Sequence, residues 1–406
     1  MKQHMLKSAS LLILIVSLLS CKRNISEAND QHKYFFKRFG SNNNEGFQFI
    51  HSGTTGKISV AGFLNTDTMS NCLLAEFDQY GQQRTSNFMS LGLTSITRGS
   101  RFMDGSFVVS DFTQDWIAEY DAAGTFIREH RYLAGGNNYF IHGKPSKLNN
   151  GEIGLGMTNG FGAGKSTNQL LLLDDNLDLK SFYALTEQDV NGHLCQLELD
   201  RMDGDYIYYS GTILPNPWTF SNPCRAFVAR LNLLDPASNF IHLLAPIDTF
   251  GDDFQIDKVN LKDDGIVQVL SKGFWIFSKT KDDGGRYFQV VNWDKDRNLR
   301  WRKTMDLGYE IHSPYSASVN AKGELLVVGS LKNGKSDPSV PFVVKLDPDG
   351  NILWKKVYLE IFDGIFTDVH ETNQGDLVFS GIIEIFGKKL EGSDGLILKT
   401  DAHGNY

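Results

Sequence analysis

One unit of sequence recurs seven times along this chain. The two clearest copies are GELLVVGS (323–330) with PFVVKLDPDGNILWKK (341–356), and GDLVFSG (375–381) with DGLILKTDAHGN (394–405). Looser copies begin near Gly56, Gly105, Gly151, Gly204 and Gly265, so successive copies start 46 to 61 residues apart. Each copy alternates short runs of β-branched and aromatic residues with turn residues, which is typical of strands and hairpins. A repeat of this kind predicts an all-β fold, a seven-bladed β-propeller in which each copy forms one four-stranded antiparallel blade.

The two ends of the repeat region predict how the ring closes. The last copy lacks a fourth strand, whereas the segment KYFFKRFG (33–40) precedes the first copy as a strand without a blade of its own. Aligned on its basic pair, Phe36-Lys37-Arg38 matches Trp354-Lys355-Lys356. We therefore expect residues 34–39 to pair with residues 396–400 and complete the last blade, which would also cover its open edge.

The N-terminal residues predict export and a lipid anchor. Lys2 and Lys7 precede an apolar run over residues 11–19, which has the length of a signal-peptide core and is too short to cross a bilayer. The segment Leu18-Leu19-Ser20-Cys21 resembles the lipobox of bacterial lipoproteins. That resemblance implies a signal peptide over 1–20 and a lipid on Cys21, with the protein in the cell envelope, at the outer membrane. An ordinary secretory signal with an incidental cysteine is the alternative.

The polar segment 22–32 lacks an apolar period, so residues 21–32 are expected to form a flexible tether ahead of a propeller over 33–406. The net charge of −8 argues against nucleic acid as a partner, because phosphate binding needs a basic surface. Three cysteines remain after Cys21, and their odd number excludes complete pairing. Three buried or half-buried thiols are the preferred interpretation, and the alternative is that Cys195 and Cys224, which fall in one copy, pair in an oxidising compartment. We expect a monomer.

Loop lengths predict which face of the propeller carries a site. With strands named a to d from the axis outward, the a–b and c–d turns are short, whereas the b–c loops are long and varied. They run over about 65–71, 111–114, 158–168, 212–224, 272–286, 331–340 and 383–394. Long loops on a rigid scaffold are where binding residues concentrate. The ligand-binding candidates on this side are Phe161, Trp218, Phe220, Trp275, His193 and His312. The alternative is that the aromatic side chains fold back as loop anchors.

Two motifs look like ligand sites but lack required residues. GFGAGKST (160–167) lacks the first glycine of a phosphate loop, where Asn159 stands, and is followed by a strand pattern instead of a helix. DKDRN (294–298) lacks the glycine and glutamate of a calcium loop and falls where other copies have a c–d turn. The aspartate at that place in most copies is expected to form the turn.

Histidine spacing suggests a cluster at the centre of the ring. His51 and His370 each stand five residues before their turn glycine, in copies that become neighbours when the ring closes. We expect both beside the central channel. His193 and His312 each stand eleven residues before their glycine, at the crossover between blades. Since a metal site needs three or four converging ligands, single exposed or core histidines are the preferred interpretation and no metal is expected.

The pieces KLDPDGNILWKK (345–356), KTDAHGN (399–405) and EFDQYGQ (76–82) resemble repeats of bacterial quinoprotein-like propellers. That superfamily includes lipoprotein scaffolds of outer-membrane assembly and quinone-dependent dehydrogenases. The quinone-dependent enzymes carry a tryptophan in nearly every blade. Here the tryptophan at that position occurs only in two copies, as Trp301 and Trp354, so no cofactor is expected. The preferred function is a non-enzymatic envelope lipoprotein that binds a protein, peptide or glycan on its b–c loop face. The alternatives are a propeller enzyme acting on polysaccharide, and a periplasmic sensor or assembly scaffold.

Overall fold

The computed structural model describes most of the repeat region. The described residues are 33–40, 44–65, 70–92, 97–102, 104–111, 116–131, 139–148, 150–159, 167–185, 192–215, 225–243, 253–261, 265–272, 288–334, 337–385 and 392–406. They form strands almost throughout, with one short 3-10 helix, η1 (Pro236–Ser238). Among these residues, we find no helix with the length and apolar character needed to span a bilayer.

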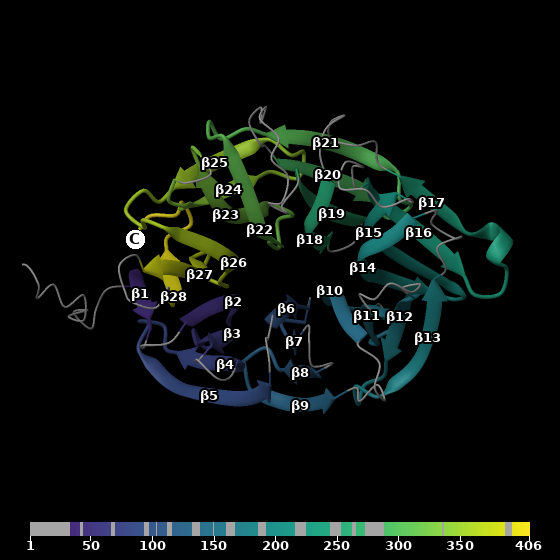
Figure 1. Ribbon diagram of the computed structural model, residues 1–406, viewed down its shortest axis with the longest axis horizontal. Helices are drawn as coiled ribbons and strands as arrows, with labels where there is room; N and C mark the ends of the chain where they lie inside the picture. The colour runs from purple at the N-terminus through teal and green to yellow at the C-terminus, as the bar shows by residue number, and fades with distance from the viewer. Residues whose placement is uncertain are drawn as a thin grey trace, which may run out of the picture.

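The strands form seven four-stranded antiparallel sheets, as the repeat predicts, and the sheets follow one another around a ring (Figure 1). Blade 1 is β2 (Asn44–Ser52), β3 (Ile58–Asn65), β4 (Ser70–Phe77) and β5 (Gln83–Gly92). Blade 2 is β6 (Thr97–Arg101), β7 (Phe107–Asp111), β8 (Trp116–Tyr120) and β9 (Phe126–Arg131). Blade 3 is β10 (Tyr139–Lys147), β11 (Ile153–Asn159), β12 (Thr167–Leu173) and β13 (Leu179–Leu185). Blade 4 is β14 (Gly192–Asp203), β15 (Tyr206–Pro215), β16 (Arg225–Asn232) and β17 (Phe240–Leu243).

The remaining three blades are built in the same way. Blade 5 is β18 (Asp253–Leu261), β19 (Gly265–Lys272), β20 (Phe288–Asp294) and β21 (Leu299–Met305). Blade 6 is β22 (Ile311–Val319), β23 (Leu325–Lys332), β24 (Val340–Leu346) and β25 (Ile352–Val357). Blade 7 combines β26 (Gly364–Glu371), β27 (Leu377–Ile385) and β28 (Gly392–Thr400) with β1 (Phe35–Phe39) from the other end of the chain. The first strand of each blade lies nearest the centre of the ring (Figure 1).

Strand β1 is the fourth strand of the last blade. It runs antiparallel to β28, with Phe35 opposite Lys399 and Phe39 opposite Gly395. The expected pairing of the two segments is confirmed, but the alignment of Phe36 with Trp354 was wrong by one residue. Trp354 lies opposite Lys345, two residues before the turn aspartate of its blade, and Phe35 lies opposite Lys399, two residues before Asp401. The equivalent of the tryptophan is therefore Phe35, not Phe36, because strand pairing fixes the position and the basic residues do not.

The c–d turns share one geometry. In blade 6 the backbone N–H of Asp347 donates to Asn351 O, and the Asp347 side chain accepts from the N–H groups of Asp349 and Asn351. The equivalent side-chain cap recurs at Asp78, Asp121, Asp174, Asp294 and Asp401. The aspartates therefore form the turns, as expected, and DKDRN (294–298) is one of them.

In six blades the fourth residue of the c–d turn faces the preceding blade; the c–d turn of blade 4 starts at Asn232 and contains η1 instead. This fourth residue has positive φ and is glycine in four blades, where a side chain would collide with a neighbour; a Cβ on Gly81 would stand 2.5 Å from Phe35. Leu177 and Arg297 hold the same position with φ of 64° and 69°. Leu177 fills a core cluster with residues of blade 2, and Arg297 pairs with Asp200 of blade 4 at 3.0 Å. At these two junctions, contacts with the preceding blade offset the cost of left-handed backbone.

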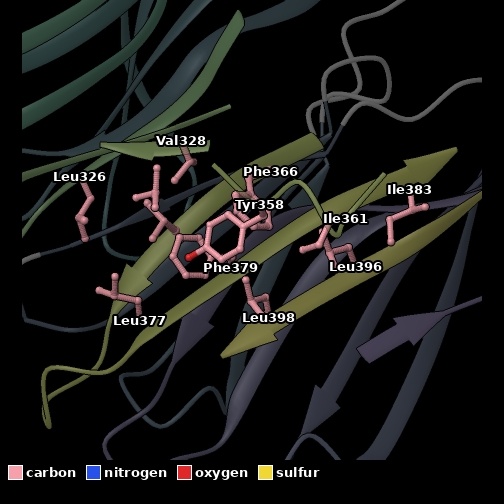
Figure 2. Packing of buried hydrophobic residues seen from close by; sticks show 12 residues of the cluster. Leu326, Val328, Tyr358, Ile361, Phe366, Leu377, Phe379, Ile383, Leu396 and Leu398 are labelled. Atoms are coloured by element: carbon pink, nitrogen blue, oxygen red, sulfur yellow. The ribbon is translucent and has the colours of Figure 1, made fainter. Parts of the chain in front are cut away.

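The core lies between the blades as well as within them. Figure 2 shows one cluster in which Leu326 and Val328 of β23 face aromatic and aliphatic side chains of blade 7. Phe366 and Phe379 stack with ring centroids 4.8 Å apart. The buried Tyr358 donates its hydroxyl hydrogen to Gly404 O at 2.9 Å, so the connection between the two blades is part of the core. These contacts join blades 6 and 7 through a shared core.

Candidate functional site

Most residues predicted to bind a ligand lie outside the described part of the chain. Phe161, Trp218, Phe220 and Trp275 belong to b–c loops that are not described, and Cys21 precedes the first described residue. The backbone of His193 lies in β14, but its side chain is not described. Their roles stay predictions. Four described features remain: His312, the axial residues, the two rims of the ring, and one connection between blades.

His312 anchors a crossover. It is the second residue of β22, where the chain enters blade 6, and its ring is buried. The backbone N–H of Leu307, in the connection from blade 5, donates to His312 Nε2 at 3.0 Å. An imidazole nitrogen that accepts this bond is unprotonated, so the contact uses the neutral ring to hold the connection in place. This geometry fits a core histidine, which is within the interpretation preferred from the sequence.

His51 and His370 lie together where blades 1 and 7 meet, and their place beside a central channel stays a prediction. They come from β2 and β26, the innermost strands of blades 1 and 7, and their rings stack with centroids 5.1 Å apart. His370 Nδ1 accepts from the backbone N–H of Ser52 at 2.8 Å. His51 Nε2 lies 3.3 Å from Ala122 O in the c–d turn of blade 2, and the His51 ring packs on Phe107.

A buried ion pair lies beside the histidines. Asp368 of β26 pairs with Arg101, which comes from β6 of blade 2. Asp368 Oδ2 also accepts from the backbone N–H of Ile50 at 3.1 Å, and its Oδ1 accepts from the Ser316 hydroxyl of blade 6 at 2.6 Å. Arg101 Nε donates in addition to Ile50 O at 3.0 Å. We call Arg101, Asp368, Ser316, His51 and His370 the axial cluster; it joins four successive blades.

Where blades 7 and 1 meet, which we call the closing junction, side chains of the cluster bind backbone groups that a neighbouring strand would otherwise pair. An innermost strand has an unpaired edge, whose N–H and C=O groups need partners when buried. On β2, the N–H groups of Ile50 and Ser52 are bound by Asp368 and His370, two residues apart on β26. From the other side, Arg101 binds Ile50 O. Side chains from both neighbouring blades thus satisfy the inner edge of blade 1.

The electrostatics of the cluster keep both histidines neutral. Burial lowers the pKa of His51 to about 4, and the nearby Arg101 guanidinium adds to the shift. Burial also lowers the pKa of His370 well below its usual range, and Arg101 and His51 act in the same direction. Neutral rings suit the two contacts, because His370 Nδ1 must accept from Ser52 and a protonated ring has no acceptor nitrogen. Both oxygens of Asp368 are used within the fold, so the arrangement is that of a structural junction.

Bulges mark a second axial layer. The register of the innermost pair of strands shifts at Gln48, Tyr315 and Thr367, each of which stands eight residues before its turn glycine. Thr367 Oγ1 donates to Phe47 O at 2.5 Å, which adds another contact between blades 7 and 1. Burial raises the pKa of the Tyr315 phenol. Because a bulge redirects a side chain, blades 6, 7 and 1 each present one polar group at a common position along their innermost strand.

The sequence reasoning missed Arg101, Asp368 and Ser316. Ser316 and Asp368 each stand seven residues before their turn glycine, so the count that linked the two histidines would also have linked these residues. Arg101 stands four residues before Gly105, the position that Ser52 holds in blade 1. A serine and an aspartate at one position and an arginine at another gave no signal of a shared bond in repeats this weak. Three-dimensional closure supplies that information.

The two rims of the ring differ. We call the face formed by the a–b and c–d turns the turn rim, and the face formed by the b–c loops and d–a connections the loop rim. On the turn rim the two kinds of turn touch: a Cβ on Gly56 would stand 3.3 Å from Gln79, and one on Gly105 would stand 3.0 Å from Ala122. The turns use their own side chains to bind their backbone N–H groups.

One described connection of the loop rim exposes apolar side chains on a fixed backbone. It runs over residues 358–363, between blades 6 and 7. Its ends are held by bonds from Tyr358 N to Pro341 O and from Ser339 N to the Asp363 side chain, and Asp363 has φ of 56°. Between them, Leu359 is 64% exposed and Phe362 is 62% exposed. Two large apolar groups held rigidly in solvent are suited to contact with a partner.

Comparisons with known proteins give no family for this chain. No protein-family model matches it, and no curated protein matches it in sequence. Among solved structures, it is similar to the polysaccharide lyase Uly1 at 9% identity and a TM-score of 0.48, covering 87% of this chain and 90% of that one. It is also similar to a protein of unknown function from Dyadobacter fermentans, at 11% identity and a TM-score of 0.43, covering 90% and 99%.

A third similarity is to prolyl oligopeptidase B from Galerina marginata. The identity is 11% and the TM-score is 0.44, and the match covers 84% of this chain and 46% of that one. None of these structures carries an argument about activity.

Proposed function

We propose that this protein is a lipid-anchored lipoprotein of the cell envelope whose propeller is a binding or scaffold module. Its ligand is a protein, peptide or glycan, and the b–c loops of the loop rim engage it. The observation that carries the proposal is the difference between the rims. The turn rim consists of tight turns that bind their own backbone groups, whereas the loop rim carries long connections such as 216–224 and 273–287.

Features of the described part of the loop rim support this assignment. Leu359 and Phe362 are exposed on a backbone that hydrogen bonds hold in place, so little ordering is needed when they meet a partner. The sequence adds Trp218 and Trp275 in the connections of blades 4 and 5. Aromatic side chains at the mouth of a rigid ring suit the apolar face of a sugar or a peptide side chain.

The axial cluster supports a scaffold role in a different way. Its ion pair and both histidines bind groups of four blades, so their chemistry is used in holding the ring. A ring whose closing junction is locked by buried side chains presents its loops at fixed distances from one another. Preorganisation of this kind favours binding, because the scaffold does not have to be ordered by the ligand.

Arrays of bacterial glycans and of peptides test the binding role. We expect the acylated protein to bind a subset of one array. Trp218→Ala or Trp275→Ala should weaken that binding by about thirtyfold, the factor that corresponds to a loss of about 2 kcal/mol, at unchanged melting temperature. Phe126→Ser, which alters an exposed residue of the turn rim, is the control and should bind like the parent. An equal loss of binding in Phe126→Ser would contradict the proposed site. So would tryptophan variants that lower the melting temperature and leave binding unchanged.

A further inference from the structure

A lysine and an asparagine of blade 6 are held by the same two carboxylates. Lys345 lies in β24, and its side chain is 9% exposed. Its Nζ lies 2.9 Å from Glu324 Oε2 and 3.2 Å from Glu371 Oε2. Asn320 Nδ2 donates to the same two oxygens, at 2.7 Å and 3.1 Å. The amine of Lys345 and the amide of Asn320 are therefore neighbours. We call these four residues the amide cluster.

The a–b turn of blade 6 polarises the carbonyl group of that amide. Asn320 Oδ1 accepts from the backbone N–H of Lys322 at 3.0 Å and from that of Glu324 at 2.9 Å. The backbone N–H of Asn320 donates to Glu324 O, which fixes the residue at the base of the turn. Two backbone donors on one oxygen stabilise negative charge that develops there during attack on the carbonyl carbon. The amine of Lys345 is a nucleophile held beside this carbon.

Blade 7 shows how much of this arrangement a turn requires. Thr372 stands where blade 6 has Asn320, three residues before the turn glycine, and its Oγ1 accepts from the backbone N–H of Asp376 at 3.1 Å. Lys399 Nζ lies 3.8 Å from Asp376 Oδ2. Blade 7 thus makes both the cap and the ion pair without an amide. The turn alone therefore does not explain the amide of blade 6, nor the second carboxylate, Glu371, which comes from β26 of blade 7.

We propose that Lys345 and Asn320 join in an intramolecular isopeptide bond. Lys345 Nζ attacks Asn320 Cγ, the new Nζ–Cγ bond replaces the Cγ–Nδ2 bond, and Nδ2 leaves. The lysine nitrogen begins with three protons and ends with one. The two that it loses pass through the carboxylates of Glu324 and Glu371 to Nδ2, which departs as ammonium, so no other reactant is consumed. The carboxylates act as general base and general acid, and the fold supplies the proximity.

The charges of the amide cluster determine the rate. Burial acts to lower the pKa of Lys345, but the hydrogen bonds and charges of Glu324 and Glu371 outweigh it and raise the pKa. Lys345 in turn lowers the pKa of Glu324, and Lys322 adds to that shift. The ion pair is favoured over a neutral amine beside a carboxylic acid, so the bond forms slowly. Because the proton moves within the cluster, both forms carry the same number of protons, and the rate should be constant between pH 6 and pH 9.

Mass spectrometry of the full chain tests the bond. After incubation at pH 7 and digestion with trypsin, we expect a branched peptide that joins residues 304–322 to residues 336–355, lighter by one ammonia than the two peptides together and uncleaved at Lys345. Absence of this peptide overturns the proposal. Loss of ammonia without a branched peptide would mean that an asparagine closes on its own backbone, and it also overturns the proposal. The peptides that carry Thr372 and Lys399 are the internal control and should stay separate.

Variants test the residues one role at a time. Asn320→Thr copies the cap of blade 7 and Lys345→Arg keeps the positive charge, so both should fold and neither should give the branched peptide. Glu324→Gln with Glu371→Gln keeps an acceptor oxygen at each place but cannot transfer protons, and it should slow bond formation by about a hundredfold. The pH profile of the parent tests the carboxylates without any substitution. A rate that rises tenfold per pH unit, or an unchanged rate in the folded glutamine variant, contradicts proton transfer through them.

Discussion

Replacing Arg101 with glutamine should destabilise the whole ring. The guanidinium pairs with Asp368, a side chain that is 2% exposed, and its Nε and Nη2 donate to Ile50 O. Without Arg101, the carboxylate keeps the Ile50 N–H and the Ser316 hydroxyl as partners but loses its counter-charge. Breaking a buried ion pair by removing one partner costs about 3 to 5 kcal/mol. We expect a loss of about 3 kcal/mol, because two of the hydrogen bonds to Asp368 remain.

Arg84→Gln is the matched control. Arg84 also pairs with an aspartate, Asp78, but its side chain is 62% exposed. An exposed pair of this kind contributes less than about 1 kcal/mol. Urea unfolding at pH 7, followed by circular dichroism and tryptophan fluorescence, gives the free energy of unfolding for the parent and both variants. Equal losses in the two variants would refute the argument that the axial cluster locks the ring.

Arg101→Gln should also raise the pKa values of His51 and His370. Arg101 is the second cause of the lowered pKa of His51 and of His370, after burial. In Arg101→Gln both pKa values should rise toward the ordinary value, while Arg84→Gln should leave them in place. Histidine ring signals followed by NMR between pH 7 and pH 4 measure this directly. A purely steric role for Arg101 predicts lower stability with unchanged histidine titration.

Three further predictions follow from the closing junction and the anchor. The pKa of His51 is about 4 in the folded protein and about 6.5 in the unfolded chain, so the unfolded chain binds the proton first as the pH falls. The free energy of unfolding should therefore fall by roughly 3 kcal/mol between pH 6.5 and pH 4. A urea midpoint that stays constant over this range contradicts the prediction. Phe35→Ala should cost about 3 kcal/mol in urea unfolding, and Phe36→Ala, which is less buried, should cost less; the reverse order would restore the original alignment. Cys21→Ser should move the protein out of the membrane fraction or leave it unprocessed, and a variant that fractionates like the parent rules out the lipid anchor.

The fold could be predicted from the sequence because the repeat carries redundant signals. Each blade supplies a turn glycine, apolar strands and a turn aspartate, which is Asn232 in blade 4, so an error in one copy is corrected by the others. The exceptions show where the signal ends. Leu177 and Arg297 replace a glycine in left-handed turns, and the reason is a side chain of the preceding blade, which no local pattern reveals. The one-residue shift at Phe35 has the same origin, since its position is set by pairing with β28.

The axial cluster was predictable in part. Equal spacing from the turn glycines brought His51 and His370 to one height, and ring closure made them neighbours. The partners Arg101 and Asp368 come from blades 2 and 7, and their ion pair crosses the end of β2 in the blade between them. Sequence spacing measures height along a strand, but it does not measure the direction of a side chain across a junction. Loop tryptophans such as Trp218 carry no period at all, so their predicted role rests on loop length and residue type.

Hydrogen–deuterium exchange with a bound ligand tests the central claim most directly. The acylated protein is compared with and without the glycan or peptide that binds best on the arrays, and exchange is mapped along the chain. The account predicts slower exchange in loop-rim segments, including 212–224, 272–286 and 358–363, with the turn segments 78–82, 121–125 and 347–351 unchanged. Protection of those turns, with the loop rim unaffected, would place the ligand on the other face and contradict the proposed function.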